Sequence, residues 1–235
     1  MNMHPRGTFI TFEGLDGCGK STQMGKLADA LRAEAYDVIT TREPGGTPIG
    51  DRIREVLLHS ANEMDAMTEL ALMFASRAQQ LAEVINPGLR EGRIVLCDRF
   101  TDSSEAYQGA GRQLGSGTVL AMHKIICGGQ QPDLTILMDS DPAHSVERAR
   151  RRNLQSRSAT ADENRFEQES RAFFERVHRQ YLAIARRDRD RVIVVNARRP
   201  IATVHREIVA MVRERLAGRI KARAKATKTP VAGGA

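Results

Sequence analysis

The sequence is poor in aromatic residues and has no long apolar run. Tryptophan is absent, and aromatic residues make up 4% of the 235 residues, which leaves little material for stacking the bases of a long nucleic acid. No stretch approaches the roughly 18 apolar residues of a membrane span. The first residues, MNMHPRGTF, contain no apolar signal segment. We therefore expect a protein that is not secreted, does not contact a membrane and binds no specific nucleic acid.

Cysteine is equally scarce. Cys18, Cys97 and Cys127 are odd in number, widely spaced and form no C-x-x-C pair. This pattern is typical of reduced thiols and argues against a disulfide framework or a zinc site. It favours a cytoplasmic location.

The formal net charge of +7 comes largely from the end of the chain. Residues 218–235, GRIKARAKATKTPVAGGA, hold five basic residues and no acidic one. They lack an apolar stripe, so we predict a solvated, disordered tail, with a weak contact to a polyanion as the alternative. The chain as a whole is 41% hydrophobic and 28% charged, which is ordinary for a globular enzyme. We predict a single domain over residues 1–217.

Short apolar runs alternate along the chain with longer segments of helical period. The runs predict strands at residues 8–12, 38–41, 94–97, 134–138 and 192–195. The periodic segments predict helices at residues 20–35, 51–59, 69–85, 144–152, 165–187 and 201–216. Because strands this apolar must be covered on both faces, we predict an α/β fold with a three-layer, doubly wound, parallel five-stranded sheet. Ligands of such sheets bind beyond the carboxyl ends of the strands.

Residues 14–21, GLDGCGKS, match the phosphate-binding pattern G-x-x-x-x-G-K-[ST] at each fixed position, between a predicted strand and a predicted helix. The glycines let backbone N–H groups surround a phosphate at the positive end of the helix. Lys20 brings a charge to the β- and γ-phosphates, and Ser21 offers a hydroxyl to Mg²⁺. The sheet is therefore predicted to be of the P-loop NTPase type. We expect ATP to bind at Gly14, Leu15, Asp16, Gly17, Cys18, Gly19, Lys20, Ser21 and Thr22.

The P-loop alone does not identify the reaction of the bound nucleotide, because P-loops occur in switches, motors, helicases and small-molecule kinases alike. Two later segments bear on this question. Residues 41–47, TREPGGT, follow the second predicted strand and place Arg42 where it could hold a phosphate. Arg54, on the next predicted helix, is either a solvated arginine or a second phosphate contact. Residues 98–109, DRFTDSSEAYQG, follow the third strand. There Asp98 can hold the water shell of Mg²⁺ while Arg99 binds an anionic acceptor, and the polar residues that follow indicate a pocket wall for a sugar or a base.

Together with FEGLDGCGKST and NRFEQES, these segments resemble those of the bacterial thymidylate kinase family in order and spacing, over about residues 8–216. The resemblance implies phosphorylation of dTMP to dTDP in the synthesis of dTTP, with ATP as donor and Mg²⁺ as cofactor. Members of the family are commonly homodimers, so we expect a homodimer here. The expected small-molecule partners are ATP and dTMP.

The resemblance also implies roles for individual residues of the dTMP site. Arg99 and Arg54 match arginines that hold the dTMP phosphate, and Arg77 matches the arginine that reads a thymine carbonyl. Asp16 matches a contact to the 3′-hydroxyl, and Tyr107 matches the tyrosine packed where a ribose 2′-hydroxyl would lie, which favours deoxyribose. The expected dTMP contacts are Asp16, Glu43, Pro44, Arg54, Phe74, Arg77, Arg99, Ser104, Tyr107, Gln108 and Glu167.

The aromatic residue that stacks on thymine departs from the family's usual spacing. It is often four residues before the arginine, where this chain has Met73, whereas Phe74 is three residues before it. Both spacings place a ring on the arginine's side of a helix. We expect Phe74 to stack on the base, with the alternative that it belongs to the core. Ser104 matches a position that faces the base, and Glu167 one that reaches the sugar.

Arginines cluster before a polar stretch that predicts a mobile loop, NLQSRSATADEN, at residues 153–164. Their simplest interpretation is a solvated helix face. The variable positions of the P-loop, however, carry Asp16 and no basic residue, so charge developing on the transferred phosphoryl group needs an arginine from elsewhere. A helical lid at about residues 148–165 would supply it, as the resemblance implies. We favour Arg148 and Arg152, with Arg157 as an alternative.

The predicted reaction is in-line transfer of the γ-phosphoryl group of ATP to the 5′-phosphate oxygen of dTMP, without a covalent enzyme intermediate. The expected metal-binding residues are Ser21 and Asp98. Two alternatives remain, namely another P-loop nucleoside or nucleoside monophosphate kinase, and a nucleic-acid-binding or switch ATPase that uses the basic tail. The expected catalytic residues are Lys20, Asp98, Arg99, Arg148 and Arg152.

Overall fold

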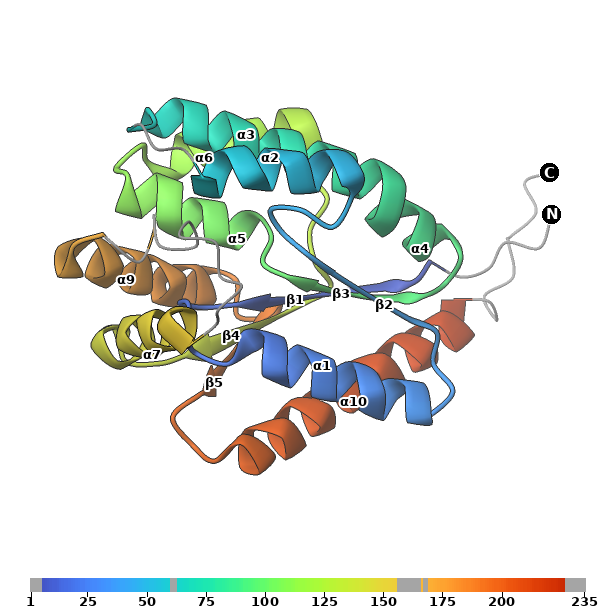
Figure 1. Cartoon of the computed structure of the whole chain (residues 1–235). Coiled ribbons are helices and arrows are strands. Elements are labelled where there is room, and N and C mark those ends of the chain that lie inside the picture. Colours follow the sequence, from blue (N-terminus) through green and yellow to red (C-terminus); the bar gives the residue numbers. More distant parts are fainter. Residues whose placement is uncertain (1–5, 60–62, 156–165, 167–168, 227–235) are drawn as a thin grey trace.

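Five strands form one parallel sheet in the order β2-β3-β1-β4-β5 (Figure 1). The computed structural model describes residues 6–59, 63–155, 166 and 169–226, the side chains of 59, 149–150, 152–155 and 219–226 excepted. The strands are β1 (Thr8–Glu13), β2 (Val38–Arg42), β3 (Ile94–Asp98), β4 (Leu134–Asp139) and β5 (Val192–Asn196). Each predicted strand is present and continues for one residue past its predicted end. The predicted doubly wound parallel sheet is confirmed.

The register of the sheet brings the sequence motifs to one edge. In β1, Phe12 lies opposite Asp98 of β3, and in β2 Arg42 lies opposite the same Asp98. Parallel strands end together at their carboxyl ends, so the P-loop after β1, the TREPGG segment from β2 and the DRF segment from β3 leave the sheet side by side. This edge is the place where an open α/β sheet binds its ligands.

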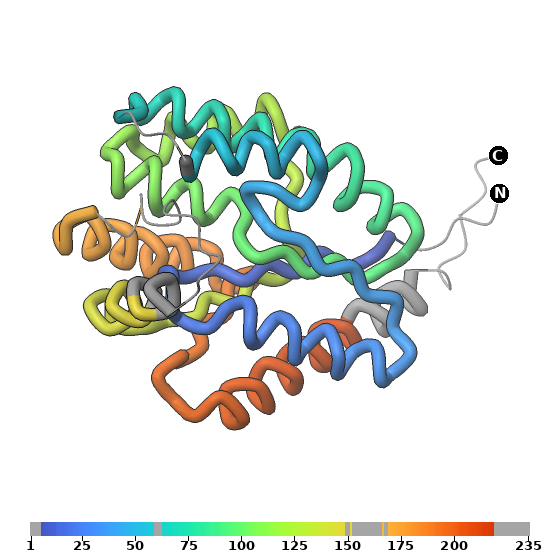
Figure 2. The backbone as a smooth tube through the Cα atoms, in the orientation of Figure 1, coloured from blue at the N-terminus to red at the C-terminus, as the bar shows by residue number. Residues whose placement is uncertain are grey.

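Helices cover both faces of the sheet (Figure 1). On one face α1 and α10 lie side by side (Figure 2), and the others lie on the opposite face or beyond the sheet edge. Two helical segments, η1 and η2, have π-helical hydrogen bonding. The bounds are α1 (Lys20–Ala33), α2 (Pro48–His59), α3 (Ala66–Gln80), η1 (Leu81–Ile85), α4 (Asn86–Arg90), α5 (Thr101–Ser104), η2 (Glu105–Gly111), α6 (Ser116–Cys127), α7 (Pro142–Gln155), α9 (Arg171–Arg187) and α10 (Ile201–Ala226).

The core follows the alternation of side chains along β1. Ile10 and Phe12 point to the face covered by α1 and α10, where they pack with Leu27 and Ile208. Phe9 points to the other face and packs against the buried side chains of α3, α4 and α6. All three β1 residues are completely buried, as expected for a central strand covered on both sides.

Several helix limits differ from the prediction. Helix α3 begins at Ala66 because the carboxylate of Asp65 accepts hydrogen bonds from the backbone N–H groups of Met67 and Thr68, a capping signal that the apolar period does not contain. Helix α6 is absent from the prediction. The sequence GSG at its start is typical of a loop and conceals it.

The predicted end of the last helix, at residue 216, is wrong. Helix α10 continues to Ala226, so part of the basic segment that was predicted to be disordered is helical. Among the described residues, no helix combines the length and the apolar character needed to cross a bilayer.

Candidate active site

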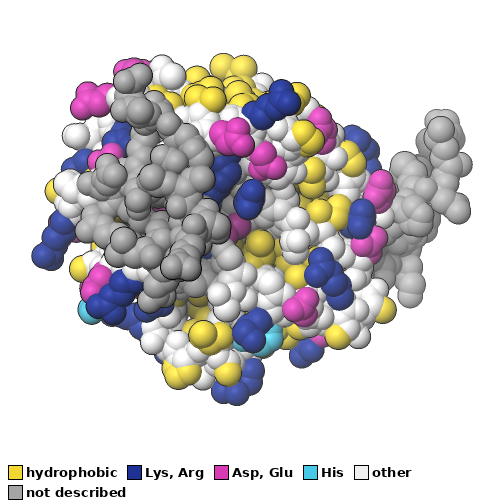
Figure 3. All heavy atoms as spheres, viewed as in Figure 1, with side chains coloured by type: hydrophobic (Ala, Val, Ile, Leu, Met, Phe, Trp, Pro, Cys, Tyr) yellow, Lys and Arg dark blue, Asp and Glu magenta, His cyan; other side chains and the backbone are white. Residues whose placement is uncertain are grey.

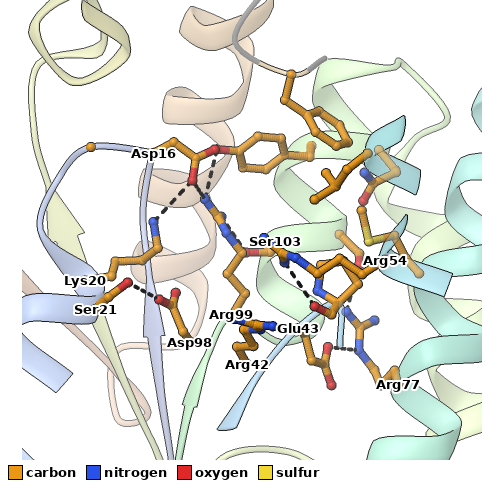
Figure 4. Close-up of a pocket in the computed structure, with 18 of the residues that line it drawn as sticks. Asp16, Lys20, Ser21, Arg42, Glu43, Arg54, Arg77, Asp98, Arg99 and Ser103 are labelled. Carbon is orange, nitrogen blue, oxygen red and sulfur yellow. Dashed lines mark hydrogen bonds and ion pairs between the residues drawn. The ribbon is translucent and has the colours of Figure 1, made fainter. Parts of the chain in front are cut away.

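A cavity of about 430 Å³ opens at the carboxyl edge of the sheet (Figure 4). It extends from the P-loop, past Arg99, to Arg77 of α3, and its volume is in the range of small-ligand sites. Its lining contains both acidic and basic side chains beside a few apolar ones. The lining residues are Asp16, Gly17, Gly19, Lys20, Ser21, Thr22, Arg42, Glu43, Pro44, Arg54, Leu58, Met73, Arg77, Asp98, Arg99, Ser103, Ser104, Tyr107, Gln108 and Phe166.

The P-loop bends through backbone conformations that require glycine. Gly14, Gly17 and Gly19 have φ values of 132°, 79° and 99°. A Cβ on Gly14 would lie 2.6 Å from the carbonyl oxygen of Met138, whereas a Cβ on Gly19 would meet nothing within 4 Å. Gly14 is therefore needed for both space and conformation, and Gly19, which precedes the first turn of α1, for conformation alone.

Lys20, Ser21 and Asp98 form the end of the cavity beside the P-loop. Nζ of Lys20 donates to the carbonyl oxygens of Gly14 and Leu15 at 3.0 and 2.9 Å, and lies 3.8 Å from Oδ1 of Asp16. The hydroxyl of Ser21 donates to Oδ2 of Asp98 at 2.7 Å. Oδ1 of Asp98 is buried and has no hydrogen-bond partner among the described residues.

Arg99 crosses the middle of the cavity and joins its two ends (Figure 4). Nη2 donates to Oδ1 of Asp16 at 2.6 Å and to the hydroxyl of Tyr107 at 3.3 Å. Nη1 donates to the hydroxyls of Ser103 at 2.9 Å and Tyr181 at 3.1 Å. Although burial lowers the pKa of the guanidinium, its interactions with Asp16 and the other acidic groups raise it well above the usual range, so Arg99 is cationic.

Arg77 and Glu43 form a buried ion pair at the far end of the cavity. Nε of Arg77 donates to Oε2 of Glu43 at 2.6 Å, and Nη2 donates to Oγ of Ser104 at 3.0 Å. Nη1 of Arg77 and Oε1 of Glu43 are buried without a hydrogen-bond partner among the described residues. Burial raises the pKa of Glu43 to about 7, against the lowering effect of Arg77. A ligand with its own donors and acceptors could satisfy both atoms.

The TREPGG segment is held against α3 by polar side chains. Nε2 of Gln80 donates to the carbonyl oxygens of Arg42 and Gly45 at 2.6 and 3.2 Å, and the Ser76 hydroxyl accepts from the N–H of Gly45 at 2.9 Å. Nη1 of Arg54 donates to the carbonyl oxygen of Pro44 at 3.1 Å. The bond to Pro44 holds Arg54, which lines the cavity, against this segment.

The wall next to Arg77 continues through η2. Nε2 of Gln108 donates to the buried carboxylate of Glu69 at 2.9 Å, and Gln108 lines the cavity. Arg112 binds the same carboxylate at 3.2 Å, and its guanidinium lies 5.7 Å from the ring centroid of Phe166. Tyr107 packs edge-on against Phe166, with the ring centroids 5.9 Å apart. This corner therefore presents amide and aromatic groups suited to a planar, uncharged ligand.

A P-loop facing a second set of arginines across one cavity, at the carboxyl edge of a parallel sheet, is the arrangement of a P-loop kinase whose acceptor is anionic. The family model "Thymidylate kinase" matches residues 12–208. The chain belongs to the thymidylate kinase family. The family match does not favour the alternative prediction of another P-loop nucleoside or nucleoside monophosphate kinase.

Relatives and a solved structure agree with the family model. The thymidylate kinases of Pseudomonas fluorescens and Thiobacillus denitrificans are each 47% identical to this chain, over 86% and 88% of it and 93% and 97% of their own lengths. The crystal structure of thymidylate kinase from Ehrlichia chaffeensis superposes with a TM-score of 0.71 at 31% identity, covering 89% of this chain and all of the other. The chain is thus a kinase of the phosphotransferase class.

Most of the residues predicted for the site line the cavity, but some lie elsewhere. The side chains of the P-loop residues Leu15 and Cys18 are buried in the core, so only their backbone can face a phosphate. Arg148 of α7 is exposed, with Nη1 3.4 Å from the carbonyl oxygen of Gly17. Arg152 lies on α7, and its side chain is outside the described part of the structure. Glu167 and Arg157 also lie outside the described residues.

The prediction that Phe74 stacks on the base is contradicted by its position. Its ring is completely buried in the core, and the Arg77 guanidinium lies 4.6 Å from the ring centroid. Met73, one position earlier, lines the cavity instead. One residue corresponds to about 100° of rotation around a helix, so only one of two neighbours can face the ligand.

Leu58 and Phe166 line the cavity and are missing from the prediction. Leu58 follows Arg54 by four residues, so the spacing of a helix face could have indicated it. Phe166 follows the predicted loop and carries no comparable signal.

Proposed function

We propose that this thymidylate kinase binds ATP at the P-loop end of the cavity and dTMP at the Arg77 end, and transfers the γ-phosphoryl group between them in line. The observation that carries the proposal is the position of Arg99, midway along the cavity and bonded at 2.6 Å to the P-loop residue Asp16. At this point the acceptor phosphate would meet the γ-phosphate. A guanidinium there neutralises the repulsion between two anions.

Lys20 is the proposed contact to the β- and γ-phosphates. Its ammonium group is bonded to two carbonyl oxygens, which are neutral acceptors. Phosphate oxygens are stronger acceptors for an ammonium ion, so ATP is expected to draw Nζ away from these carbonyls. The backbone N–H groups of the loop and the start of α1 add further positive potential.

Ser21 and Asp98 fit an Mg²⁺ ion. No group of three or more His, Cys, Asp or Glu ligands occurs among the described residues, so no all-protein metal cage is present there. Mg²⁺ commonly keeps several waters and takes one or two carboxylates together with substrate phosphates. The unpartnered Oδ1 of Asp98 beside the Ser21 hydroxyl supplies such a position. When bound, the ion would neutralise charge on the transferred phosphoryl group.

The acceptor contacts are proposed from the geometry of the far end. Arg99 and Arg54 would hold the dTMP phosphate, and Tyr107 and Asp16 would surround the sugar. Arg77, Ser104 and Gln108 would face the base, with Glu43 and Pro44 beneath them. Met73, rather than Phe74, would contact the base ring from α3. Glu167 remains a proposed sugar contact.

The chain needs no general base for this transfer, because the acceptor oxygen of dTMP is already anionic. Its residues bring the two phosphates together and exclude water from them. Arg148 and Arg152 on α7 are the proposed lid arginines that stabilise charge on the phosphoryl group. Arg148 donates to the carbonyl oxygen of Gly17, so this part of α7 lies beside the P-loop.

A substrate panel tests the proposed acceptor. ADP release is followed with ATP and Mg²⁺ in the presence of each common nucleoside monophosphate, and with thymidine. We expect rapid turnover with dTMP, slower turnover with dUMP and none with thymidine. Phosphorylation of thymidine but not dTMP would overturn the proposal, as would ATP hydrolysis that depends on DNA or RNA.

A homodimer and a cytoplasmic location are further proposals. Hydrophobic side chains gather over α2 and α3 at the top of the molecule in Figure 3. Of the hydrophobic residues on these two helices, Ile49, Val56 and Met67 are exposed, and Ile125 of α6 is 82% exposed. An exposed apolar surface of this kind favours association with a second copy. Three free cysteines are consistent with a reducing compartment.

A further inference from the structure

Glu13, the last residue of β1, is a buried carboxylate that the proposed reaction does not use. It is 1% exposed and lies directly before the P-loop. Oε1 accepts the backbone N–H of Phe100 at 2.7 Å. Oε2 accepts the hydroxyl of Ser103 at 2.5 Å and that of Tyr181 at 3.1 Å. Its hydrogen-bond partners thus come from the segment after β3, from α5 and from α9.

The same two hydroxyls are the partners of Arg99. Nη1 of Arg99 donates to Ser103 and to Tyr181, and the two hydroxyl oxygens lie 2.8 Å apart. A guanidinium can only donate and an ionised carboxylate can only accept. The Ser103 proton therefore points to Glu13, and the Tyr181 proton points to Glu13 or to Ser103. In either case both oxygens present lone pairs to Arg99.

Glu13 also restrains the backbone next to Arg99. Arg99 has a φ of 75°, in the left-handed region that disfavours a side chain with a Cβ. Its own N–H donates to the carbonyl oxygen of Phe12 at 2.9 Å, and the next N–H, of Phe100, donates to Glu13. Two bonds to the end of β1 thus hold this unfavourable conformation in place.

We propose that Glu13 is a positioning residue that orients Arg99 toward the acceptor phosphate. It accepts the N–H of Phe100 and the proton of Ser103, and it fixes the proton of Tyr181 either directly or through Ser103. The inference rests on the proposed role of Arg99 in binding dTMP. When a phosphate draws Nη2 away from Asp16, Nη1 keeps its two hydroxyl partners. The guanidinium can then turn only about this fixed point, which reduces the entropy lost on binding.

Glu13→Gln is the sharpest variant because it keeps the shape and reverses the polarity. The amide oxygen can accept the N–H of Phe100 in place of Oε1. The amide NH₂ then faces Ser103 and Tyr181 as a donor, so at least one hydroxyl proton must turn toward Arg99. Glu105→Gln is the matched control. Glu105 is also 1% exposed, and it binds Arg187 at 2.8 Å and Gln180 at 2.9 Å, both on α9.

The experiment compares the steady-state kinetics of the full chain and these two variants at about pH 8. Burial and the nearby Asp102 raise the pKa of Glu13 to about 7, so pH 8 lies above this pKa and Glu13 is ionised. We expect Glu13→Gln to raise KM for dTMP about tenfold or more, the effect of losing a hydrogen bond to a charged group. KM for ATP and the urea midpoint should change no more than in Glu105→Gln. Tyr181→Phe, which keeps the ring in the core, should raise KM for dTMP roughly threefold to tenfold.

A double-mutant cycle separates this proposal from the role of Arg99. If Glu13 acts through Arg99, Glu13→Gln combined with Arg99→Ala should be no worse for dTMP than Arg99→Ala alone. Additive effects, or a Glu13→Gln enzyme that behaves like Glu105→Gln while Arg99→Ala is impaired, would overturn the role of Glu13 alone. An Arg99→Ala enzyme with an unchanged KM for dTMP would overturn both roles. Should Glu13→Gln fail to fold, Tyr181→Phe decides in the same cycle.

Discussion

Replacing Glu43 by Gln tests whether the ionised carboxylate at the acceptor end of the cavity lowers the free energy of unfolding. Glu43 is 4% exposed and its partner Arg77 is 1% exposed, so neither charge is solvated. One carboxylate oxygen accepts from Arg77 at 2.6 Å, and the other has no partner among the described residues. Burial outweighs the attraction of Arg77 and raises the pKa of Glu43 from 4.5 to about 7.

The direction of the pH effect follows from this shift. Between pH 4.5 and about 7 the folded state holds a proton on Glu43 that the unfolded state has lost. The contribution of Glu43 to the free energy of unfolding is therefore fully present below about pH 4.5 and is lost as the pH rises through about 7. At about 1.4 kcal/mol per pH unit, the loss is on the order of 3 kcal/mol.

Urea unfolding of wild type and Glu43→Gln at about pH 5 and about pH 8 measures this contribution. The variant should gain about 2 to 3 kcal/mol relative to wild type over that interval, because a Gln side chain has no proton to lose. Glu13 titrates in the same window, but it is present in both proteins and cancels in the difference.

Glu91→Gln is the control, since it removes a carboxylate that is 61% exposed and bonded to Arg93 at the surface. Its stability difference from wild type should stay constant over the same pH interval. Parallel pH profiles for Glu43→Gln and wild type would refute the reasoning, because they would mean that Glu43 ionises as easily in the folded chain as in the unfolded one.

Four further substitutions test the proposed site. Lys20→Ala should lower kcat by about a hundredfold or more with little change in urea stability, and near-normal turnover would remove Lys20 from the phosphate site. Arg99→Ala should raise KM for dTMP by about tenfold to a hundredfold and leave KM for ATP unchanged, as a dTMP titration would show. Asp98→Asn should shift the Mg²⁺ dependence of the rate to higher concentration, and an unmoved Mg²⁺ titration would contradict its assignment. Gly19→Ala should weaken ATP binding and lower stability by about 1 kcal/mol, because φ of 99° is strained for alanine even where space is open.

The fold could be predicted from local pattern because the apolar runs of the strands are continuous and well separated. Each predicted strand is present, and each continues for one more residue, which is polar in every case (Glu13, Arg42, Asp98, Asp139 and Asn196). Apolar content cannot mark these ends, since they depend on the hydrogen bonds of the sheet. Helix α6 was missed for a related reason, because the glycines at its start mask a segment stabilised by packing under α3.

The same distinction applies to the site, where features that depend on neighbouring residues could be predicted and features that depend on distant segments could not. The P-loop could be recognised because its phosphate-binding groups are consecutive in the chain. Phe74 and Met73 could not be distinguished, because the rotation of α3 about its axis is set by what it packs against. The buried network around Arg99 was also beyond prediction, since Glu13 and Tyr181 are 168 positions apart and meet only through the sheet and α9.

By itself, the order of residues determined the phosphate-binding loop, the parallel sheet and the chain's place among the thymidylate kinases, because each depends on groups close together in the chain. Only the tertiary structure decided which neighbouring side chain faces the ligand, which carboxylates are buried and what orients Arg99. Those properties arise from desolvation and from hydrogen bonds between distant segments, and both come into existence when the layers pack.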